Sequence, residues 1–387
     1  MPEVLLITNL NKSSPRIRGL IENLPKFDWY PTILTPQITR LSEVGTRDYE
    51  NWKIVDTPYR NVLGSNRTLG SVSIPWVSSF LGEILNYPCP DKNWLPEAYR
   101  EGKLLLETGR FSAVISSSAP VVSHLVASCL QREFGLTWIA DLRDLWSQNH
   151  NYTYSRLRRD RDQKLELQTL AKAKLVTVSE PWAAKLSELH NKPVCTIVSG
   201  FGPRRDNSER ASEGLTISYT GSIYKGRQNP FMLLHALKTL QDQGKLLDAK
   251  VYYCGPNPLP RGFKFLRNLG TLPREVVLST VQARSELLWI MDWDSEGERG
   301  VYPGKLFEYI SASRPVISTG GIQGNVVDTF LKDTNTGRHC LTEEDTKEAL
   351  LDFHSQYKTL GRIPFLPNSS LKNWTQLEMA RKFVEQL

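Results

Sequence analysis

The sequence lacks several features that would assign it to common classes. No apolar run approaches the length of a membrane-spanning helix, and the start, Met1 to Glu3, lacks the charged segment and apolar stretch of a secretion signal. No GxGxxG segment follows a predicted strand, which disfavours a dinucleotide-dependent oxidoreductase. Five cysteines stand singly, without a CxxC pair, and predict neither disulfides nor zinc: Cys89, Cys129, Cys195, Cys254 and Cys340. We therefore expect a cytoplasmic protein.

Size and positive charge are what the sequence does have. A chain of 387 residues exceeds the size at which one hydrophobic core keeps growing, so two domains are the natural division. The net charge of +7 suits an anionic partner: nucleotide phosphate, an acidic lipid leaflet or nucleic acid. Charge alone does not choose among these partners.

Short apolar runs alternate with helical patterns along most of the chain. This alternation predicts an α/β protein with parallel, doubly wound sheets. The first series has strands at 4–7, 32–34, 113–115, 138–140, 175–178 and 194–198, with helices at 16–24 and from about residue 120. The second has strands at 215–219, 250–254, 286–291 and 315–319, with helices at 230–241, 273–283, 305–312 and 324–331.

A stretch without periodicity separates the two series. Residues 200–214 are rich in Gly, Arg, Ser and Asp and form the predicted connection. We thus expect domains at 1–200 and 215–368, followed by a terminal helix within 369–387 whose apolar stripe packs back across the domains. The insertion at 40–103 gives the weakest structural signal.

The segment from Tyr302 to Tyr309 is the most informative one. It follows a predicted buried strand, and a helix that starts there presents unpaired amide groups and a partial positive charge to an anion. Gly304 allows a phosphate to come close, Lys305 adds a full charge, and Glu308 could accept hydrogen bonds from ribose hydroxyls. The alternative is a surface helix with a solvated lysine and glutamate.

A second glycine turn follows the first strand of the second series. In this turn, Gly221 precedes two cations, Lys225 and Arg227, which is a plausible diphosphate clamp. The alternative is a basic surface turn.

Together these segments resemble the donor half of a GT-B glycosyltransferase of family 4. The first domain adds to the resemblance: 141–146 is similar to the Asp-Leu-Arg-Asp-Pro-Trp segment of that group, and 14–19 resembles its first acceptor-side loop. The resemblance implies two Rossmann-like domains facing a central cleft, with the donor in the second domain and the acceptor in the first. It also implies retention of anomeric configuration, and a lysine and a helix terminus in place of a metal.

The resemblance also implies roles for single residues. Gly221, Lys225 and Arg227 would lie at the donor diphosphate, with Ser222 in the same turn; Lys305 would face phosphate and Glu308 would bind ribose. The sequence departs from the pattern in one place, because Gly300 stands where many members have a second glutamate, with Glu298 and Glu296 slightly upstream. Glu298 either substitutes through a shifted loop or is a solvated acid.

On the acceptor side, Asp141 closes a predicted strand, so we expect its carboxylate to project from the end of the sheet into the cleft, where a general base or a hydroxyl-orienting group would be needed. We take Asp141, Lys225 and Lys305 as catalytic candidates. The acceptor-side candidates are Ser14, Arg16, Arg18, His124 and Asp144. Two of them have structural alternatives: Asp144 could pair with Arg143, and a lone histidine such as His124 is usually a satisfied structural residue.

Two other charged segments receive plainer interpretations. Asp292-Trp293-Asp294 matches the DxD pattern that binds metal in a different glycosyltransferase fold, but we expect no metal here. Residues 156–162 are most simply a solvated helix face.

The sequence therefore predicts an enzyme that transfers a sugar from a nucleoside-diphosphate sugar, its co-substrate, to a hydroxyl acceptor without another cofactor. The alternatives are a nucleoside-diphosphate-sugar epimerase or hydrolase on the same scaffold, and a basic nucleic-acid-binding module. We expect no nucleic-acid partner, because aromatic residues are not interleaved with cations in a recognisable motif. Peripheral contact with an anionic membrane, through residues such as Trp76 and Trp94, is also expected.

Overall fold

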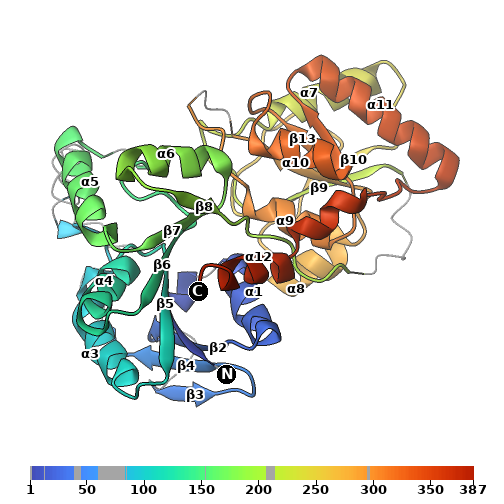
Figure 1. Ribbon diagram of the computed structural model, residues 1–387. Helices are drawn as coiled ribbons and strands as arrows, with labels where there is room; N and C mark the ends of the chain where they lie inside the picture. Colours follow the sequence, from blue (N-terminus) through green and yellow to red (C-terminus); the bar gives the residue numbers. More distant parts are fainter. Residues whose placement is uncertain are drawn as a thin grey trace. The chain divides into compact units, whose positions relative to one another are not determined.

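The computed structural model describes residues 2–12, 14–38, 45–59, 83, 85–152, 154–205, 214–293 and 297–387. The chain divides into two compact units. The first contains residues 1–198 together with 376–387, and the second contains residues 199–375 (Figure 1). Each unit has its own sheet and its own hydrophobic core.

The first unit is built on a sheet with strand order β3-β4-β2-β1-β5-β6-β7-β8. All neighbouring strands are parallel except β3, which runs antiparallel to β4. The strands are β1 (Glu3–Ile7), β2 (Tyr30–Pro36), β3 (Thr46–Asp48), β4 (Lys53–Thr57), β5 (Phe111–Ser117), β6 (Thr137–Leu142), β7 (Lys174–Thr177) and β8 (Val194–Thr196).

Helices cover both faces of this sheet. Helix α1 packs against α12, and both belong to a core with Val4, Leu6, Ile115 and Ile139. Residues alternate between faces along a strand, so the opposite face meets α4, which contacts β1, β5 and β6. The helices are α1 (Pro15–Asn23), α3 (Leu95–Leu106), α4 (Val122–Phe134), α5 (Arg156–Leu170), α6 (Glu180–His190) and α12 (Gln376–Val384).

The second unit has a parallel sheet with strand order β11-β10-β9-β12-β13-β14. The strands are β9 (Thr216–Thr220), β10 (Lys250–Cys254), β11 (Leu266–Asn268), β12 (Leu287–Met291), β13 (Val316–Thr319) and β14 (Gly337–Cys340). The helices are α7 (Phe231–Asp242), α8 (Arg274–Val276), α9 (Gly304–Ser311), α10 (Val326–Thr334) and α11 (Glu343–Leu360), and a π-helix spans Val277–Gln282.

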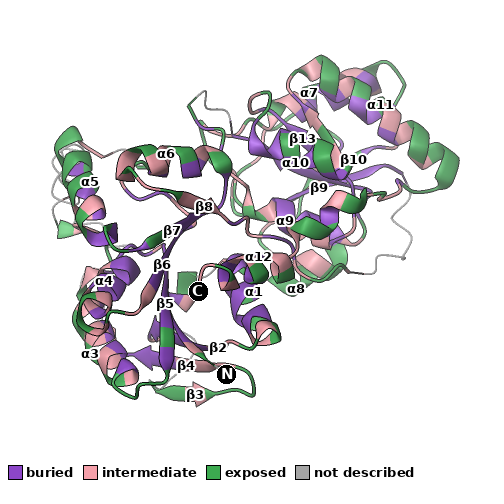
Figure 2. Ribbon diagram, viewed as in Figure 1, coloured by how far each residue is buried: buried purple, intermediate pink, exposed green. Residues whose placement is uncertain are grey.

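Continuous burial explains why β12, with the sequence Leu-Leu-Trp-Ile-Met, is visible as an unbroken apolar run. β9, labelled in Figure 2, is buried along its whole length, and so is β12. A strand covered by helices on both faces has no solvated side, so the polar residues that alternate along β9 are bonded inside the unit, as Ser218 Oγ is to Ser285 Oγ at 2.6 Å. The expected series of strands and helices is thus confirmed for the described residues, although the predicted helix at 273–283 is α8 followed by the π-helix.

The strand orders place a topological switch point in each unit. In the first sheet the chain passes from β1 to β2 on one side and later to β5 on the other. In the second sheet it passes from β9 to β10 on one side and later to β12 on the other. Ligands of open α/β sheets bind beside such points, outside the carboxyl ends of the strands. The functional site is therefore sought after β1 and β5, and after β9 and β12.

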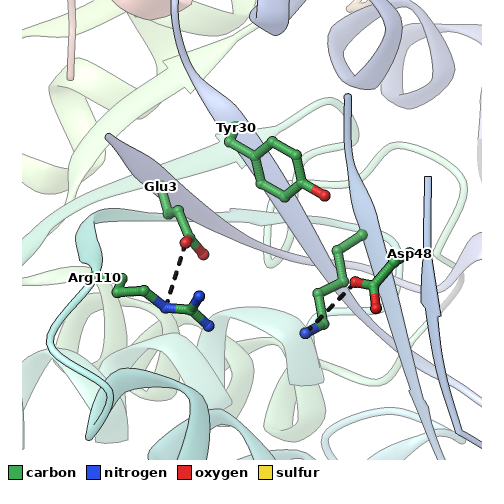
Figure 3. A pocket seen from close by; sticks show the side chains of 5 residues that line it. Glu3, Tyr30, Asp48 and Arg110 are labelled. Atoms are coloured by element: carbon green, nitrogen blue, oxygen red, sulfur yellow. Dashed lines mark ion pairs between the residues drawn. The ribbon is translucent and has the colours of Figure 1, made fainter. Parts of the chain in front are cut away.

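A pocket of about 320 Å³ lies at the opposite, amino-terminal edge of the first sheet (Figure 3). Two ion pairs line it, Arg110 with Glu3 at 3.4 Å and Lys53 with Asp48 at 3.6 Å. Tyr30 lies between them, and burial together with the Asp48 carboxylate raises the pKa of its phenol. Because its charges are paired and it lies away from the carboxyl ends, we do not assign the reaction to this pocket.

One surface expectation is wrong. Within helix α5, Arg158 and Asp162 are buried and form an ion pair at 2.7 Å, so residues 156–162 are not simply a solvated face. Arg158 also donates to the carbonyl of Pro88 at 2.7 Å and stacks over Tyr87, which ties α5 to the preceding insertion.

Among the described residues, no helix combines the length and the apolar character needed to span a membrane.

Candidate active site

The second unit brings Gly221 and Lys305 together at its switch point. Gly221 directly follows β9, and Lys305 is the second residue of α9, the helix that follows β12. Tyr219 lies on the face of the sheet covered by α7, whereas its neighbour Thr220 hydrogen-bonds Tyr309 of α9 on the other face. The Lys305 side chain nevertheless reaches Tyr219, so it crosses over the carboxyl end of β9.

Lys305 is held by a phenol rather than by a carboxylate. Its Nζ donates to Tyr219 Oη at 2.6 Å and lies 4.2 Å from the centroid of the same ring. It forms no ion pair with any carboxylate in the described part of the chain. Burial lowers the pKa of Lys305 to about 8, although nearby Glu308 acts in the opposite direction. A half-buried cation with this surrounding is poised to take an anionic ligand.

Gly221 is a glycine for two physical reasons. Its φ of +119° is a conformation that side chains of L-residues rarely adopt. A Cβ at this position would also lie 3.3 Å from Lys305 Nζ. The missing side chain therefore gives Lys305 its path over the end of the strand. The backbone of Gly255 packs closely against the carbonyl oxygen of Gly221, because a Cβ on Gly255 would lie 2.3 Å from that oxygen.

Glu308 lies one turn after Lys305 and is held from two sides. Its Oε1 accepts from Gln282 Nε2 at 2.6 Å, and its Oε2 pairs with Arg274 at 2.8 Å. Gln282 in turn donates to Thr220 Oγ1 at 3.1 Å, which connects the carboxylate to the end of β9. A carboxylate has about four lone-pair sites, so Glu308 keeps acceptor capacity for further hydroxyl groups.

The first turn of α9 is open to solvent. Pro303 at the N-cap position provides no side-chain cap, and Gly304 is exposed, with no atom within 4 Å of the place that a Cβ would take. The amide groups of this turn and the Lys305 ammonium thus lie at the same edge of the sheet. This is the arrangement that favours an anion at a helix N-terminus.

The other predicted donor residues lie in the turn after Gly221. Ser222 is exposed, and its carbonyl accepts from Tyr219 Oη at 2.8 Å. Lys225 is exposed and makes no side-chain hydrogen bond or ion pair with another described residue. Arg227 is partly buried, with its guanidinium 5.9 Å from the centroid of Trp293. The structure does not join these side chains to Lys305 by a direct contact.

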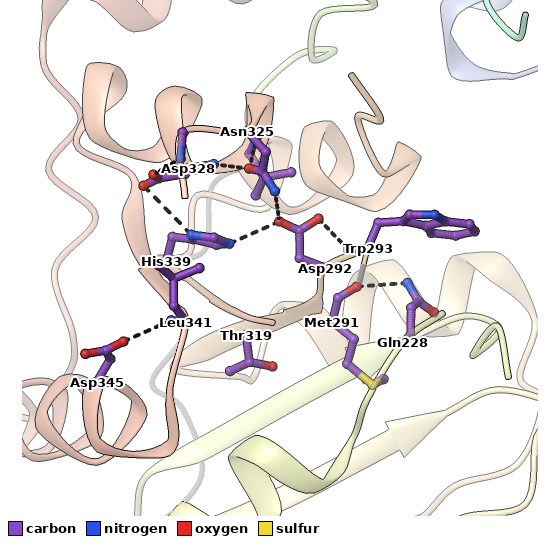
Figure 4. A network of polar contacts seen from close by, with 12 residues as sticks. Gln228, Met291, Asp292, Trp293, Thr319, Asn325, Asp328, His339, Leu341 and Asp345 are labelled. Atoms are coloured by element: carbon purple, nitrogen blue, oxygen red, sulfur yellow. Dashed lines mark hydrogen bonds and ion pairs between the residues drawn. The ribbon is translucent and has the colours of Figure 1, made fainter. Parts of the chain in front are cut away.

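Asp292, at the end of β12, belongs to a buried polar network (Figure 4). Its Oδ2 accepts from Asn325 at 2.8 Å and lies 3.1 Å from His339 Nε2, and its Oδ1 accepts from the amide of Trp293 at 2.7 Å. Both oxygens are thus engaged inside the unit. Asp294, the other carboxylate of the DxD pattern, lies outside the described residues.

Metal chemistry stays a prediction from the sequence. The described residues contain no group of three or more His, Cys, Asp or Glu side chains suited to a metal ion. Because Asp292 is committed to Asn325 and His339, it is not a free ligand here.

Glu298 is not a solvated acid. Its side chain is buried, and its Oε1 accepts from the amide of Gly300 at 2.9 Å. It therefore shapes the loop that leads into α9, two residues before Gly300, which stands where the family pattern has a further glutamate. Glu296 lies outside the described residues.

In the first unit, Asp141 and Arg16 form a buried ion pair. Arg16 donates to Asp141 Oδ1 at 2.7 Å and from Nε to Oδ2 at 3.1 Å, and Ser117 Oγ donates to Oδ2 at 2.8 Å. A third nitrogen of Arg16 donates to the carbonyl of Ile197 at 2.6 Å. The expectation that the Asp141 carboxylate projects freely from the end of the sheet is therefore not met, because its oxygens are consumed by neighbours.

Three other acceptor-side candidates differ in how far they are buried and in what they contact. His124 is fully buried, its Nδ1 lies 2.7 Å from Ser116 Oγ, and burial lowers its pKa to about 4, which keeps it neutral. Ser14 occupies the N-cap position of α1 without a side-chain cap bond, and Arg18 is exposed and paired with Glu22 at 2.7 Å. Of these, Arg18 alone presents its charge to solvent.

Asp144 differs from Asp141 although the two are close in sequence. It is half-buried, and burial raises the pKa of its carboxyl while Arg143 opposes that shift. Arg143 donates instead to the carbonyls of Lys12 at 3.1 Å and Ala119 at 3.2 Å, so the expected Arg143–Asp144 ion pair does not form in the described structure. The Asp144 carboxylate is the more accessible of the two aspartates.

Of the two tryptophans expected at a membrane surface, the structure describes Trp94. Trp94 is fully buried and donates to Thr57 Oγ1 at 2.7 Å, so the expectation for this residue is wrong. Trp76 lies outside the described residues.

Comparison by sequence finds no matching family model and no matching curated protein. Comparison by structure does find relatives in fold. The chain is similar to a sucrose-phosphate synthase from Thermosynechococcus elongatus, with 13% identity and a TM-score of 0.61 over 100% of this chain and 98% of that one. It is also similar to HepE from Anabaena in complex with UDP and glucose, with 10% identity and a TM-score of 0.58 over 100% and 99%.

A putative UDP-N-acetylglucosamine 2-epimerase from Listeria monocytogenes is similar as well, with 10% identity and a TM-score of 0.50 over 99% of this chain and 94% of that one. At these identities the likeness shows the fold alone. The GT-B fold predicted from the sequence is confirmed, and the reaction must be argued from the site.

Sequence reasoning missed the residues that hold the site in shape. Tyr219 lies two residues after Ile217 on the same face of β9 and looked like a core residue, and Gln282 lies in a π-helix that gives no distinct pattern. Arg274 follows a proline at the start of a short helix and carried no motif. Each gains its place through a contact with Lys305 or Glu308, more than 20 residues away in sequence.

Proposed function

We propose that the protein is a glycosyltransferase that moves a sugar from a nucleoside-diphosphate sugar to a hydroxyl acceptor. The observation that carries the proposal is Lys305, a half-buried cation without a carboxylate partner, placed over Gly221 at the switch point of the second sheet. A buried charge normally has an opposite charge beside it. A diphosphate would supply that charge and would also accept hydrogen bonds from the first turn of α9.

Glu308 extends the proposed site toward a nucleoside. The carboxylate lies on the same helical face as Lys305 and retains acceptor capacity beside its bonds to Gln282 and Arg274. Vicinal ribose hydroxyls are donors that a carboxylate accepts well, as acidic residues do in dinucleotide folds. Ser222, Lys225 and Arg227 would lie along the diphosphate when the turn after β9 closes on it. The fold similarity to HepE, solved with UDP and glucose, supports a nucleotide sugar as donor.

Breaking the bond between sugar and diphosphate requires stabilisation of the leaving group's negative charge. We assign this task to Lys305 and the α9 amide groups, with Lys225 as a further cation, because preorganised positive charge is most effective where charge develops. We further propose that transfer needs no metal and retains the anomeric configuration. Analysis of the product anomer by NMR, in the presence of a chelator, tests both points.

The acceptor would bind at the carboxyl edge of the first sheet. Asp144 is the carboxylate there that is best suited to orient or deprotonate a hydroxyl, since Asp141 is consumed by Arg16 and Ser117. Arg18, with its exposed charge, is a candidate contact for an anionic acceptor or for an anionic membrane that carries a lipid-linked acceptor. Flotation with vesicles of neutral and of anionic lipid tests the membrane contact.

The epimerase alternative acts on the donor alone. It is kept open by the fold similarity to the Listeria protein. Incubation with nucleoside-diphosphate sugars without an acceptor separates the two: an epimerase changes the sugar at rates that do not need an acceptor, whereas a transferase gives at most slow hydrolysis.

The first experiment is a thermal-shift panel of nucleoside diphosphates and their sugars. A ligand present at a hundred times its dissociation constant stabilises the folded protein by about 2.7 kcal/mol. We expect one base to be preferred and its diphosphate to stabilise more than the nucleoside. If nonspecific DNA stabilises the protein and no nucleotide does, the nucleic-acid-binding alternative replaces this proposal.

A further inference from the structure

Tyr219 occupies a central position among the residues around Lys305. It is the second-to-last residue of β9, fully buried, and its ring lies 6.0 Å from that of Tyr253 and edge-on to Trp289 at 5.7 Å. These aromatic neighbours fix the ring, so the position of its hydroxyl is fixed as well. That hydroxyl emerges at the carboxyl end of the sheet, beside the turn that begins with Gly221.

The hydrogen bonds of the hydroxyl have a defined direction. A protonated lysine has three donors and no acceptor, so in the 2.6 Å contact Lys305 donates and Tyr219 accepts. The single Tyr219 proton is then given to the carbonyl of Ser222 at 2.8 Å. Burial raises the pKa of the Tyr219 phenol far above its usual value, so it stays protonated and can play both parts.

This chain of bonds leaves Lys305 with two further donors in a fixed place. Its Nζ is anchored on one side by Tyr219 and has Gly221 as its neighbour on the other, where a Cβ would approach to 3.3 Å. We infer that Tyr219 is a positioning residue that orients the Lys305 ammonium over the Gly221 turn, and that binding of a nucleoside diphosphate there is coupled to uptake of a proton in alkaline solution.

The coupling follows from the groups that face Lys305. On β9 these are the Tyr219 phenol and the end of the strand at Gly221, and on α9 the charged neighbour is Glu308. Burial outweighs the attraction of Glu308, so the pKa of Lys305 falls to about 8 in the ligand-free protein. A diphosphate favours the charged form, and therefore its binding above pH 8 must restore a proton to the lysine.

Two opposite pH trends result. Diphosphate affinity should decline as the pH rises above about 8, because charging the lysine then costs free energy. The unfolding free energy of the ligand-free protein should rise with pH between about 8 and the ordinary pKa of lysine. In that interval the unfolded chain holds the lysine proton and the folded chain does not. A general alkaline denaturation would lower both quantities together.

The test is a double-mutant cycle on binding of UDP and other nucleoside diphosphates, measured by calorimetry from pH 6.5 to 10. Tyr219→Phe keeps the ring and removes the hydroxyl, and we expect about tenfold weaker binding at pH 7, with the alkaline decline moved to lower pH. In the Lys305→Met background the same change should have no effect on binding. Tyr253→Phe is the matched control, since it removes a hydroxyl from the adjacent ring whose partner is Asn257 rather than Lys305.

Proton uptake gives a second readout that does not depend on the Tyr219 variant. Calorimetry of wild-type protein at pH 8.5 to 9 in two buffers of different ionisation enthalpy should show uptake of protons on binding, and Lys305→Met should show none. The inference would be overturned if Tyr219→Phe weakened diphosphate binding equally in the wild-type and the Lys305→Met backgrounds. It would also be overturned if Tyr219→Phe left the alkaline decline of affinity at the same pH.

The inference rests on the proposed function, and the two can fail separately. If wild-type protein binds no nucleoside diphosphate at any pH, the proposed function fails. If wild-type protein binds UDP or another diphosphate and Tyr219→Phe behaves like Tyr253→Phe, only the positioning role fails.

Discussion

Each unit places a cationic side chain beside its switch point, and the two cations have different surroundings. In the first unit Arg16, on the helix after β1, is buried against the Asp141 carboxylate and the Ile197 carbonyl, and one of the Asp141 oxygens also accepts from Ser117. In the second unit Lys305, on the helix after β12, meets a neutral phenol. The first charge is neutralised within the fold, whereas the second has no carboxylate partner among the residues that the structure describes.

This difference shows that a motif position does not define a role. A basic residue near the carboxyl ends of parallel strands suggests anion binding in either unit. Whether it is available depends on the carboxylates that the rest of the chain brings to it. Asp141 is 125 residues from Arg16 in sequence, and no pattern of neighbouring residues predicts their contact.

The largest expected effect comes from breaking the Arg16 pair. Asp141→Ala leaves a buried guanidinium without its carboxylate, which should cost about 3–5 kcal/mol of unfolding free energy. Urea denaturation measures the loss, and hydrogen exchange should locate it in the first unit. Binding of nucleoside diphosphates by the second unit should be retained.

The opposite result would restore the role that the sequence suggested. If Asp141→Ala keeps its stability and loses glycosyl transfer, the aspartate acts in the chemistry and the ion pair is incidental.

A smaller effect is expected from closing the path of Lys305. Gly221→Ala adds a Cβ 3.3 Å from Lys305 Nζ at a φ of +119°, and backbone strain of this kind costs roughly 1–3 kcal/mol. The lysine must move, so we expect about tenfold weaker binding of UDP or the preferred diphosphate in an equilibrium titration. Gly262→Ala is the control, because it has a φ of +99° and no neighbouring atom within 4 Å. Equal losses of affinity in both variants would contradict this explanation.

Glu308 offers a more modest change. Glu308→Ala removes the proposed ribose acceptor, and at roughly 1 kcal/mol for a hydrogen bond we expect about fivefold weaker binding. The diagnostic readout is the preference for a ribonucleotide over its 2′-deoxy form, which should disappear. Arg274→Ala removes only the exposed partner of the pair and should keep that preference. A preference that survives in Glu308→Ala would place the ribose elsewhere.

The smallest effect is expected at Arg18. Its pair with Glu22 is exposed and spaced four residues apart, so Arg18→Ala should change the unfolding free energy by less than about 0.5 kcal/mol. Thermal denaturation of Arg18→Ala and of Asp141→Ala under the same conditions compares the two losses of unfolding free energy. If transfer falls while stability does not, Arg18 contacts the acceptor or the surface that carries it.

Much of the fold was predictable because parallel strands buried on both faces are often short runs of apolar residues. β1, β5 and β12 fall where those runs lie, and β9 and β10 fall where strands were expected. One readable signal was overlooked: Thr342 and Asp345 form a capping box at the start of α11, and a Thr-x-x-Asp spacing before an acidic turn predicts a helix there.

The candidate site was predictable only in part. Gly221, Lys305 and Glu308 follow from strand ends and a helix start, which are local features. Tyr219 could not be singled out, since a tyrosine in a buried strand is usually a core residue, and its role depends on a lysine 86 residues away. The same limit explains Asp141, whose accessibility was assumed from its place at a strand end and is removed by a distant arginine.

The most direct test of the central claim compares two lysines of the second unit. Lys305→Met removes the charge over Gly221, whereas Lys238→Met removes an exposed lysine of α7 paired with Asp242. Calorimetric titration with UDP and the other nucleoside diphosphates at pH 7 should give wild-type affinity for Lys238→Met and roughly ten- to a hundredfold weaker binding for Lys305→Met. Wild-type affinity in the Lys305 variant, with the fold intact, would contradict the claim that this lysine holds the diphosphate.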